Sequence, residues 1–445
     1  MSIYQTHLAK RQANEQTATQ LLVALAKLTA QNVTVLFFGE KVALSVSDIL
    51  AKHDKAGIDV ADSLALADGL DIANTTLDLG QAIKAGKKAS DFVSGQEIPA
   101  TDVVLYGFGR IGRILARLLM SRPASDKGLQ LKAIVVRPAG DGDLDKRGSL
   151  LERDSVHGWF DGAVQIDNDN GGIVVNGRFI KFIYASDPSE IDYTAYGIDN
   201  AIVIDNTGKW KDEAGLSKHL ASKGVKKVLL TAPAKGEIKN VVYGVNHDTI
   251  GNDSIVSAAS CTTNAITPAL KVLHDTYGII NGHMETVHAF TNDQNLVDNH
   301  HKSDRRGRAA PLNMVMTSTG AASAVSKAIP ELKGKLTGNA IRVPTPNVSL
   351  AILNLNFEKA VGSKDELNAF MKSKSESLEW QEQIDYSDSP EAVSTDFVGS
   401  QKVAIFDAKA TIAQDSRATL YIWYDNEMGY STQVIRVAET MATNG

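Results

Sequence analysis

The chain has 445 residues, of which 43% are hydrophobic and 22% are charged. This length and composition are those of an ordinary globular protein with two or three domains. The formal charge of −6 argues against a general role on nucleic acid or on a membrane surface, because both favour a basic protein face.

The first 98 residues differ from the rest and predict a mainly helical N-terminal extension. Four leucines recur at helical spacing, at Leu21, Leu22, Leu25 and Leu28. Further helix-like windows cover residues 47–53 and 77–93, and the apolar run 33–38 fits a short buried strand. No metal, phosphate or catalytic signature occurs here, so residues 1–98 are interpreted as an appendage for oligomerisation or docking.

A glycine-rich turn follows, between an apolar strand at 103–106 and an amphipathic helix. Its glycines, Gly107, Gly109 and Gly112, form a G-x-G-x-x-G pattern. The first permits the tight turn, the second lets the backbone approach a pyrophosphate, and the third allows close packing of helix on strand. In this context the motif predicts dinucleotide binding rather than a merely structural turn.

Later apolar runs complete the predicted fold. LKAIVVRP, AIVIDNTG and KKVLLTAP read as further strands separated by helix-length segments, which predicts a parallel α/β sheet of the Rossmann type. After residue 260 the runs become longer and alternate, as in HMETVHAF and ATLYIWYD. We therefore expect a Rossmann domain over 99–260, completed by a C-terminal helix at 428–445, and a mixed α+β catalytic domain over 261–427.

Cofactor choice depends on the end of the second strand of that sheet. Arg137 stands where dinucleotide folds usually carry an Asp or Glu for the ribose 2′-OH. An arginine favours a 2′-phosphate, so NADP is favoured and NAD remains possible. In the alternative, Arg137 is simply solvated and Asp141 or Asp143 reaches the ribose.

Cys261, in SAASCTTNAIT, is the only cysteine, so no internal disulfide can form and a reducing compartment is expected. It precedes a predicted helix, and a thiol at a helix N-terminus has a lowered pKa. His288 lies 27 residues later in a strand-like run and is a candidate base. His300 and His301 match no metal signature, and no metal site is predicted. With no signal-like start and no run of about 18 apolar residues, the cytoplasm is the expected location.

Several motifs together resemble phosphorylating glyceraldehyde-3-phosphate dehydrogenase. Behind GFGRIGR come, in order, SCTTN, TVHA, STGAA, RVPTPNVS, STDF and WYDNEMGYS. The resemblance runs from about residue 102 to the C-terminus and leaves out the first 98 residues. It implies oxidation of glyceraldehyde 3-phosphate to an acyl phosphate with inorganic phosphate as co-substrate, and a homotetramer. No nucleic-acid or membrane partner is expected, given the acidic charge of the chain.

The resemblance also assigns roles to residues of this chain. It makes Cys261 the nucleophile that forms a thiohemiacetal and then a thioester, and His288 the base, with Asn264 near the oxyanion. Substrate and phosphate would meet Ser260, Thr262, Thr291, Thr319, Gly320 and Arg342. At the cofactor it places Arg110, Ile111, Thr207, Gly208, Thr231, Asn426 and Tyr430, in addition to Gly107, Gly109 and Gly112 of the glycine motif and to Arg137, which the residues themselves indicate.

The sequence also departs from the family pattern. Val136-Arg137-Pro138 replaces the usual Asn-Asp-Pro, and the segment 292–314 after the histidine is altered, which bears on the tetramer contacts. Its KSDRRGR stretch is interpreted as part of a subunit-contact loop. Two alternatives stay open: an erythrose-4-phosphate dehydrogenase, which hydrolyses the thioester, and a dehydrogenase core with a regulatory or binding role through residues 1–98.

Overall fold

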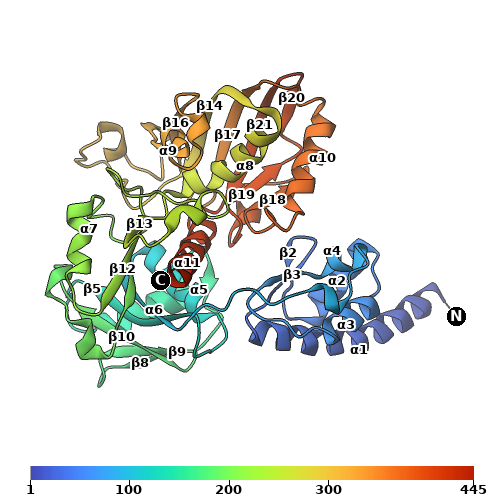
Figure 1. Cartoon of the computed structure of the whole chain (residues 1–445), viewed down its shortest axis with the longest axis horizontal. Coiled ribbons are helices and arrows are strands. Elements are labelled where there is room, and N and C mark those ends of the chain that lie inside the picture. Colours follow the sequence, from blue (N-terminus) through green and yellow to red (C-terminus); the bar gives the residue numbers. More distant parts are fainter. Residues whose placement is uncertain (1, 445) are drawn as a thin grey trace. The chain divides into compact units, whose positions relative to one another are not determined.

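A computed structural model describes residues 2–444 (Figure 1). The chain forms two compact units. One comprises the residues up to Ile98 together with Arg122–Lys127, and the other comprises Pro99–Ser121 and the residues from Gly128 onward.

The N-terminal unit has a core of its own. Three leucines of the predicted stripe, Leu21, Leu25 and Leu28, are each at most 2% exposed along helix α1 (Ile3–Ala30), while Leu22 is half-buried. The predicted strand is present as β1 (Thr34–Phe37), at the centre of a three-stranded sheet. The other elements are β2 (Glu40–Lys41), α2 (Val46–Ala56), α3 (Val60–Asp68), β3 (Thr76–Asp78), α4 (Leu79–Lys84) and η1 (Ala89–Asp91).

The helix predicted over 77–93 is present only in part. Asp78 ends strand β3 and caps α4, its carboxylate accepting the Gln81 N–H at 2.9 Å. The same carboxylate accepts the N–H groups of Phe38 and Gly39 at 2.9 and 2.6 Å. The segment therefore changes from strand to short helix at a residue whose tertiary contacts its sequence pattern does not reveal.

In the larger unit, the Rossmann lobe is built on an eight-stranded sheet in the order β13-β12-β11-β4-β5-β10-β9-β8. The first six strands of this order, from β13 through β4 to β10, pair with their neighbours in parallel. Strand β9 pairs antiparallel with β10, and β8 pairs antiparallel with β9 at the edge of the sheet. The strands are β4 (Thr101–Tyr106), β5 (Leu129–Val136), β8 (Val164–Asp167), β9 (Gly172–Val175), β10 (Arg178–Tyr184), β11 (Ala201–Asp205), β12 (Val225–Leu230) and β13 (Ile255–Ser257).

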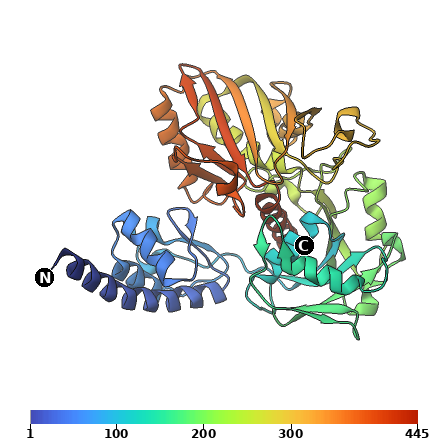
Figure 2. The same cartoon turned by 180° about the vertical axis from the view of Figure 1, so that it is seen from behind.

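Helices cover this sheet and complete the lobe: α5 (Arg110–Met120), α6 (Asp143–Glu152), α7 (Glu213–Leu220) and α11 (Met428–Thr443). The last of them, α11, comes from the C-terminal end of the chain yet shares the core of this lobe. It lies beside α5 and α8 in both views, where the two lobes of the unit meet (Figures 1 and 2). A short hairpin, β6 (Arg153–Asp154) with β7 (Gly158–Trp159), follows α6.

The second lobe carries a mixed sheet in the order β15-β16-β14-β17-β21-β19-β18, with β20 beside β21. Its strands are β14 (Ile279–Ala289), β15 (Val315–Ser318), β16 (Leu336–Val343), β17 (Ser349–Phe357), β18 (Ile384–Ser387), β19 (Ala404–Asp407), β20 (Ile412–Gln414) and β21 (Arg417–Tyr424). One face packs on α8 (Cys261–Tyr277), α9 (Ala321–Ala328) and α10 (Lys364–Ser375).

The pairing of strands in the second lobe positions the candidate catalytic side chains. Strand β14 pairs in parallel with β16, so that His288 lies opposite Arg342. Helix α8 begins at Cys261, directly after β13 of the Rossmann sheet and a short turn. Within residues 2–444, no helix combines the length and the apolarity needed to cross a bilayer.

Candidate active site

Cys261 and His288 lie together. The Cys261 Sγ atom is 3.5 Å from His288 Nε2, although the two residues come from a helix start and a strand 27 positions apart. Ser260 caps α8, its hydroxyl accepting the Thr263 N–H at 3.1 Å. The sulfur therefore sits in the first turn of a helix, where free N–H groups and the helix dipole favour negative charge.

The loop before the cysteine is held in an unusual conformation. Ala259 has φ of +53°, a region that L residues seldom adopt. Its carbonyl accepts the Tyr430 hydroxyl at 3.1 Å. Asn264 donates its amide to the carbonyls of Ala258 and Ser260 at 2.9 and 3.0 Å. Asn264 and Tyr430 thus fix the turn that aims the sulfur, and the Asn264 amide is bound to backbone rather than presented to an oxyanion.

The ring of His288 is oriented from its far side. Nδ1 donates to the Ala289 carbonyl at 2.7 Å, which leaves the Nε2 lone pair directed at the sulfur. Arg342 donates Nη1 to the same carbonyl at 2.9 Å. In this tautomer the imidazole can accept the thiol proton.

Burial dominates the titration of the pair. It raises the pKa of the Cys261 thiol, although the charge of Arg342 and hydrogen bonds from Thr262 act in the opposite direction. Burial, together with the charge of Arg342, lowers the pKa of His288 to about 3. The expected depression of the thiol pKa at a helix start is therefore outweighed by desolvation, and the neutral thiol–imidazole pair is favoured.

Most residues expected to bind phosphate have side chains or positions that suit an anion, but Thr262 does not. Arg342 has a buried Nε atom with no partner among residues 2–444. Thr319 and Gly320 stand at the start of α9, where the Thr319 hydroxyl accepts the Ala321 N–H at 3.2 Å. Thr291 lies two residues after the end of β14 and is half-buried. The Thr262 hydroxyl instead bonds the buried Tyr424 hydroxyl at 3.0 Å, so the structure does not bring that side chain to an anion site.

Arg306 is a cation near this site that the sequence interpretation did not single out. It donates Nε to the Thr317 hydroxyl at 3.1 Å and Nη1 to Asp293 at 2.5 Å. Its charge lowers the pKa of both His288 and Arg342. The signal lay in KSDRRGR, which was interpreted only as a subunit-contact loop.

The glycine turn fits a pyrophosphate. Gly107 has φ of +102°, and a Cβ on Gly112 would lie 2.3 Å from the Gly107 carbonyl oxygen. Space is open beside Gly109, the N-terminal cap of α5. The Arg110 side chain is bound to Asp154 and Glu427, so Arg110 and Ile111 could meet a phosphate only through their backbone N–H groups.

Substituting Gly112 should damage both fold and cofactor site. We expect Gly112→Ala to lower the unfolding free energy by about 2 kcal/mol, because the methyl group overlaps a fixed carbonyl. Dinucleotide affinity should fall as well. Gly109→Ala is the matched control and should weaken dinucleotide binding without a change in thermal stability. A Gly112→Ala variant that melts like the wild type would contradict the packing role.

Polar residues also gather at the carboxyl end of β11. The Asp205 carboxylate accepts both the N–H and the hydroxyl of Thr207 at 2.7 Å. The Thr231 hydroxyl donates to the Asp205 carbonyl at 3.0 Å, and Gly208 has φ of +63°. These contacts hold Thr207, Gly208 and Thr231 at the edge of the parallel sheet where dinucleotide folds bind their ligand.

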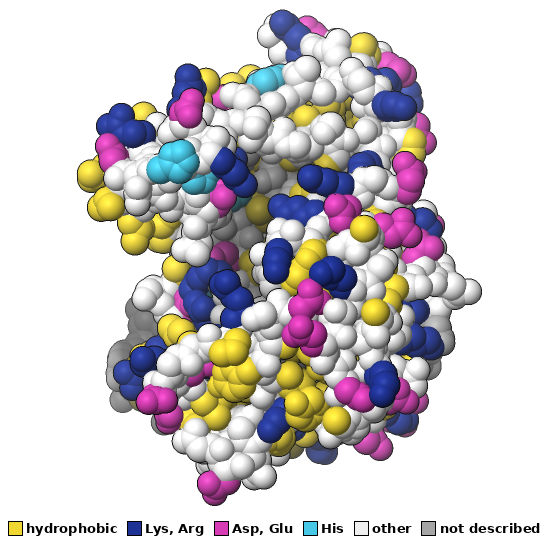
Figure 3. All heavy atoms as spheres, turned by 90° about the vertical axis from the view of Figure 1, so that its left-hand side faces the viewer, with side chains coloured by type: hydrophobic (Ala, Val, Ile, Leu, Met, Phe, Trp, Pro, Cys, Tyr) yellow, Lys and Arg dark blue, Asp and Glu magenta, His cyan; other side chains and the backbone are white. Residues whose placement is uncertain are grey.

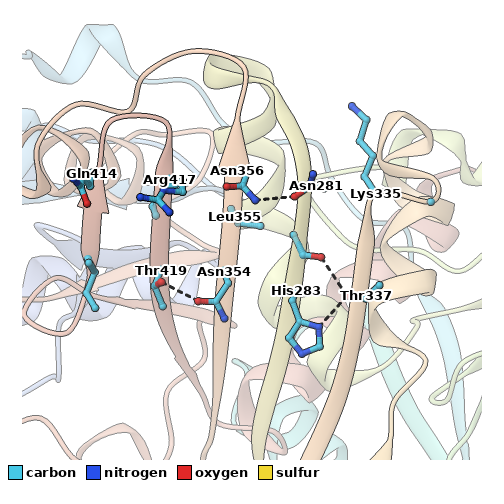
Figure 4. Close-up of a pocket in the computed structure, with 14 residues that line it drawn as sticks. Asn281, His283, Lys335, Thr337, Asn354, Leu355, Asn356, Gln414, Arg417 and Thr419 are labelled. Carbon is cyan, nitrogen blue, oxygen red and sulfur yellow. Dashed lines mark hydrogen bonds between the residues drawn. The ribbon is translucent and has the colours of Figure 1, made fainter.

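The surface of the larger unit has a hollow between its lobes and a separate pocket. A space-filling view shows a hollow between its two lobes, with Lys and Arg side chains along it (Figure 3). A pocket of about 680 Å³ lies elsewhere, over the outer ends of β14, β16, β17 and β21 (Figure 4). Its lining includes His283, Lys335, Asn354 and Arg417 but neither Cys261 nor His288.

This fold and glycine turn place the larger unit among dehydrogenase-like proteins that join a dinucleotide-binding lobe to a second lobe with a mixed sheet. Residues 101–213 match the NAD binding domain of glyceraldehyde 3-phosphate dehydrogenase, and residues 260–426 match its C-terminal domain. The chain belongs to the glyceraldehyde-3-phosphate dehydrogenase family. Both the resemblance and the fold class expected from the sequence are confirmed, including the additional N-terminal segment.

Relatives differ in how much of this chain they cover. Glyceraldehyde-3-phosphate dehydrogenase 1 of Bacillus subtilis is 41% identical over 78% of this chain and 99% of its own length. The chloroplastic glyceraldehyde-3-phosphate dehydrogenase GAPB of Arabidopsis thaliana is 41% identical over 82% of this chain and 79% of its own. A glyceraldehyde-3-phosphate dehydrogenase-like protein of Pseudomonas aeruginosa is 56% identical over 84% of this chain and 85% of its own.

Proposed function

We propose that this protein catalyses the phosphorylating oxidation of glyceraldehyde 3-phosphate through a thioester on Cys261. The observation that carries the proposal is the 3.5 Å approach of Cys261 Sγ to His288 Nε2 at the start of a helix. Arg342, next to His288, supplies a positive charge for a phosphate group.

The proposed steps use these residues in turn. His288 Nε2 takes the thiol proton as Sγ attacks the aldehyde carbon, and the proton then passes to the new oxyanion, giving a thiohemiacetal. A nicotinamide dinucleotide held by the glycine turn, with Asn426 at its nicotinamide end, would supply the hydride acceptor for that carbon. His288 removes the hydroxyl proton in the same step, which leaves a thioester. A phosphate oxygen attacks the thioester carbonyl, the C–S bond breaks, and the Cys261 sulfur leaves as thiolate.

The charges and N–H groups around Cys261 support this mechanism. Negative charge develops on the carbonyl oxygen during each addition, next to the backbone N–H groups of the first turn of α8. The Cys261 N–H is the proposed donor. Arg342, whose buried Nε has no partner among residues 2–444, would pair with a substrate or attacking phosphate together with Ser260, Thr291, Thr319 and Gly320.

One assay separates this proposal from its nearest alternative. Steady-state turnover of glyceraldehyde 3-phosphate should require phosphate or arsenate, because in the proposed reaction one of these anions, rather than water, releases the acyl group from Cys261. An erythrose-4-phosphate dehydrogenase would instead turn over its substrate to the free acid without phosphate. Phosphate-independent acid formation at the full rate would reject the phosphorylating reaction.

NADP preference is proposed from the end of β5. Arg137 is exposed there, in the position next to the last strand residue. Asp143, one of the carboxylates that could have reached a ribose, is instead held by Arg147 Nε at 2.7 Å and by the Tyr184 hydroxyl. With Asp143 occupied, the basic side chain is the one best placed to meet a 2′-phosphate.

Arg137→Asp should therefore reverse cofactor choice. We expect kcat/KM with NADP to fall about tenfold or more relative to NAD, because a carboxylate repels a 2′-phosphate and accepts a ribose hydroxyl. Arg122→Asp, at a site outside the sheet edge, serves as a charge-matched control. An unchanged ratio of the two kcat/KM values would remove Arg137 as the discriminating residue.

A regulatory or binding role for the N-terminal unit is a second candidate. The unit has its own hydrophobic core, and the match to the Pseudomonas protein covers more of the chain than lies after Ile98. Removal of residues 2–98 should leave the chemical steps intact and change assembly, a binding partner or regulation. If none of these changes, the idea of a regulatory or binding role fails.

A homotetramer is proposed for the core, supported by exposed apolar side chains in the 292–314 loop, among them Leu296, Leu312 and Met314.

A further inference from the structure

A buried charge cluster joins the glycine turn to the turn between β21 and α11. It contains one histidine and three carboxylates, with Arg110 at the start of α5. Its members are Arg110, Asp154, His157, Asp425 and Glu427. The side chains of His157 and Asp425 are 2% and 0% exposed, so the contact between these two is shielded from solvent.

His157 is the central member of this cluster. Its Nε2 atom lies 3.0 Å from Asp425 Oδ2. On the other side of the ring, Nδ1 lies 3.6 Å from Asp154 Oδ1 and 3.7 Å from Glu427 Oε2. The His157 backbone N–H donates to Asp154 at 2.9 Å. One ring thus touches both the β6–β7 hairpin of the Rossmann lobe and the turn that follows β21.

Arg110 ties the same two segments together from the glycine turn. It follows Gly109 directly, donates Nε to Glu427 at 2.8 Å and also pairs with Asp154. The pKa of Asp154 is held well below its usual range: burial raises it, but hydrogen bonds from His157 and Arg110 outweigh that effect. The first residue of the dinucleotide-binding helix is therefore linked to the Asp425–Glu427 turn.

Asp425 shapes that turn. Its Oδ1 accepts the N–H groups of Glu427 and Met428 at 2.9 and 2.8 Å, and its Oδ2 accepts the Gly399 N–H at 2.8 Å in addition to facing His157. Asn426 lies within this turn. Its position is fixed on the other side by Ser349, whose hydroxyl donates to Asn426 Oδ1 at 2.9 Å.

Ser349 in turn connects to the catalytic strand. Its hydroxyl oxygen accepts the Ala289 N–H at 3.0 Å, one residue after His288. Asn426 is therefore held between two anchors, the Ser349 contact to β14 and the Asp425 contact to His157. The resemblance assigns Asn426 to the nicotinamide, but it assigns nothing to His157.

We propose that His157 is a positioning residue that, through Asp425, fixes the Asn426 turn and so selects the bound orientation of the nicotinamide end of the cofactor. This inference rests on the proposed function for the role of Asn426. A histidine that contributes only to folding would support every part of the cofactor site equally. A positioning role predicts a loss confined to the nicotinamide half.

The test compares a complete cofactor with a fragment that lacks nicotinamide. Dissociation constants of His157→Ala and His157→Gln are measured for the preferred reduced dinucleotide by its fluorescence. They are then measured for ADP-ribose carrying the same 2′ substituent. For His157→Ala we expect about a tenfold weaker affinity for the dinucleotide and less than a twofold change for ADP-ribose. Gln can place an N–H near the former Nε2, so His157→Gln should recover most of the dinucleotide affinity.

A matched control is His247→Ala. His247 is a half-buried histidine of the Rossmann lobe, with its ring tilted by 42° against that of Tyr243, and its Nδ1 accepts the Gly244 N–H at 3.2 Å. The His247→Ala variant should leave both dissociation constants unchanged.

If His157→Ala does not fold, Asp425→Asn tests the same link, because the new amide N–H would face the Gly399 N–H or the ring of His157. It should show the same selective loss.

Two results would overturn the proposal. One is a parallel loss of both ligands in His157→Ala, which would indicate a general structural role. The other is an unchanged dinucleotide affinity. Failure of the proposed function is recognised separately, since a wild-type protein that binds dinucleotide but does not oxidise glyceraldehyde 3-phosphate would still give the two binding constants.

Discussion

Replacing Cys261 by serine should lower turnover of glyceraldehyde 3-phosphate by about four orders of magnitude or more, while dinucleotide binding stays near that of the wild type. Sγ and Oγ are similar in size, so the first turn of α8 should keep its geometry. An alcohol is far harder to ionise than a thiol, and His288 with a pKa of about 3 is too weak a base to compensate.

The serine variant is measured by steady-state rates and by quenching of dihydronicotinamide fluorescence. Thr263→Ser is the matched control, because it alters a neighbouring hydroxyl residue of the same helix turn without touching the sulfur. Normal turnover in Cys261→Ser would remove the sulfur from the mechanism. Loss of cofactor binding would mean that the substitution had damaged the lobe interface.

Replacing His288 by asparagine should reduce kcat by about 10²- to 10⁴-fold, the range for loss of a positioned general base. The Asn side chain can keep the contact to the Ala289 carbonyl but has no basic nitrogen to take the proton of the sulfur. The substrate KM should change less than kcat. The apparent pKa for alkylation of Cys261 should rise, because burial already disfavours the thiolate and its proton acceptor is gone.

The pH profile of iodoacetamide alkylation checks this directly. Cys261 becomes reactive as pH rises through its apparent pKa, so the variant profile should lie at higher pH than that of the wild type. His274→Asn, in the last turn of α8, is a control whose profile should match the wild type. Coincident profiles for His288→Asn and the wild type would show that the two side chains do not share a proton.

Much of this architecture was accessible from the sequence because the signals are local. A strand, three glycines and an amphipathic helix are contiguous, and their meaning follows from backbone geometry. Gly107 and Gly112 illustrate this, since a positive φ and a 2.3 Å approach require glycine at those positions. The proximity of Cys261 and His288 was of a different kind. It depends on β14 lying beside the start of α8. The residues alone made His288 one candidate base, and the resemblance singled it out as the partner of Cys261.

What the sequence could not provide were contacts between distant segments. Asn264 and Tyr430 bind the backbone before Cys261, and Asp78 joins a turn 40 residues away, through partners that no local pattern indicates. The direction of the Cys261 pKa shift also depends on three-dimensional burial. A helix start alone predicts a lowered pKa, but desolvation by the surrounding lobes reverses it.

The central claim is that an acyl group is carried on the single sulfur. The most direct test is mass spectrometry of protein quenched after mixing with glyceraldehyde 3-phosphate and oxidised dinucleotide in phosphate-free buffer. A 3-phosphoglyceroyl adduct should accumulate on the peptide that contains Cys261, and added phosphate should discharge it as an acyl phosphate. Dinucleotide reduction with that peptide unmodified at every quench time would contradict the account.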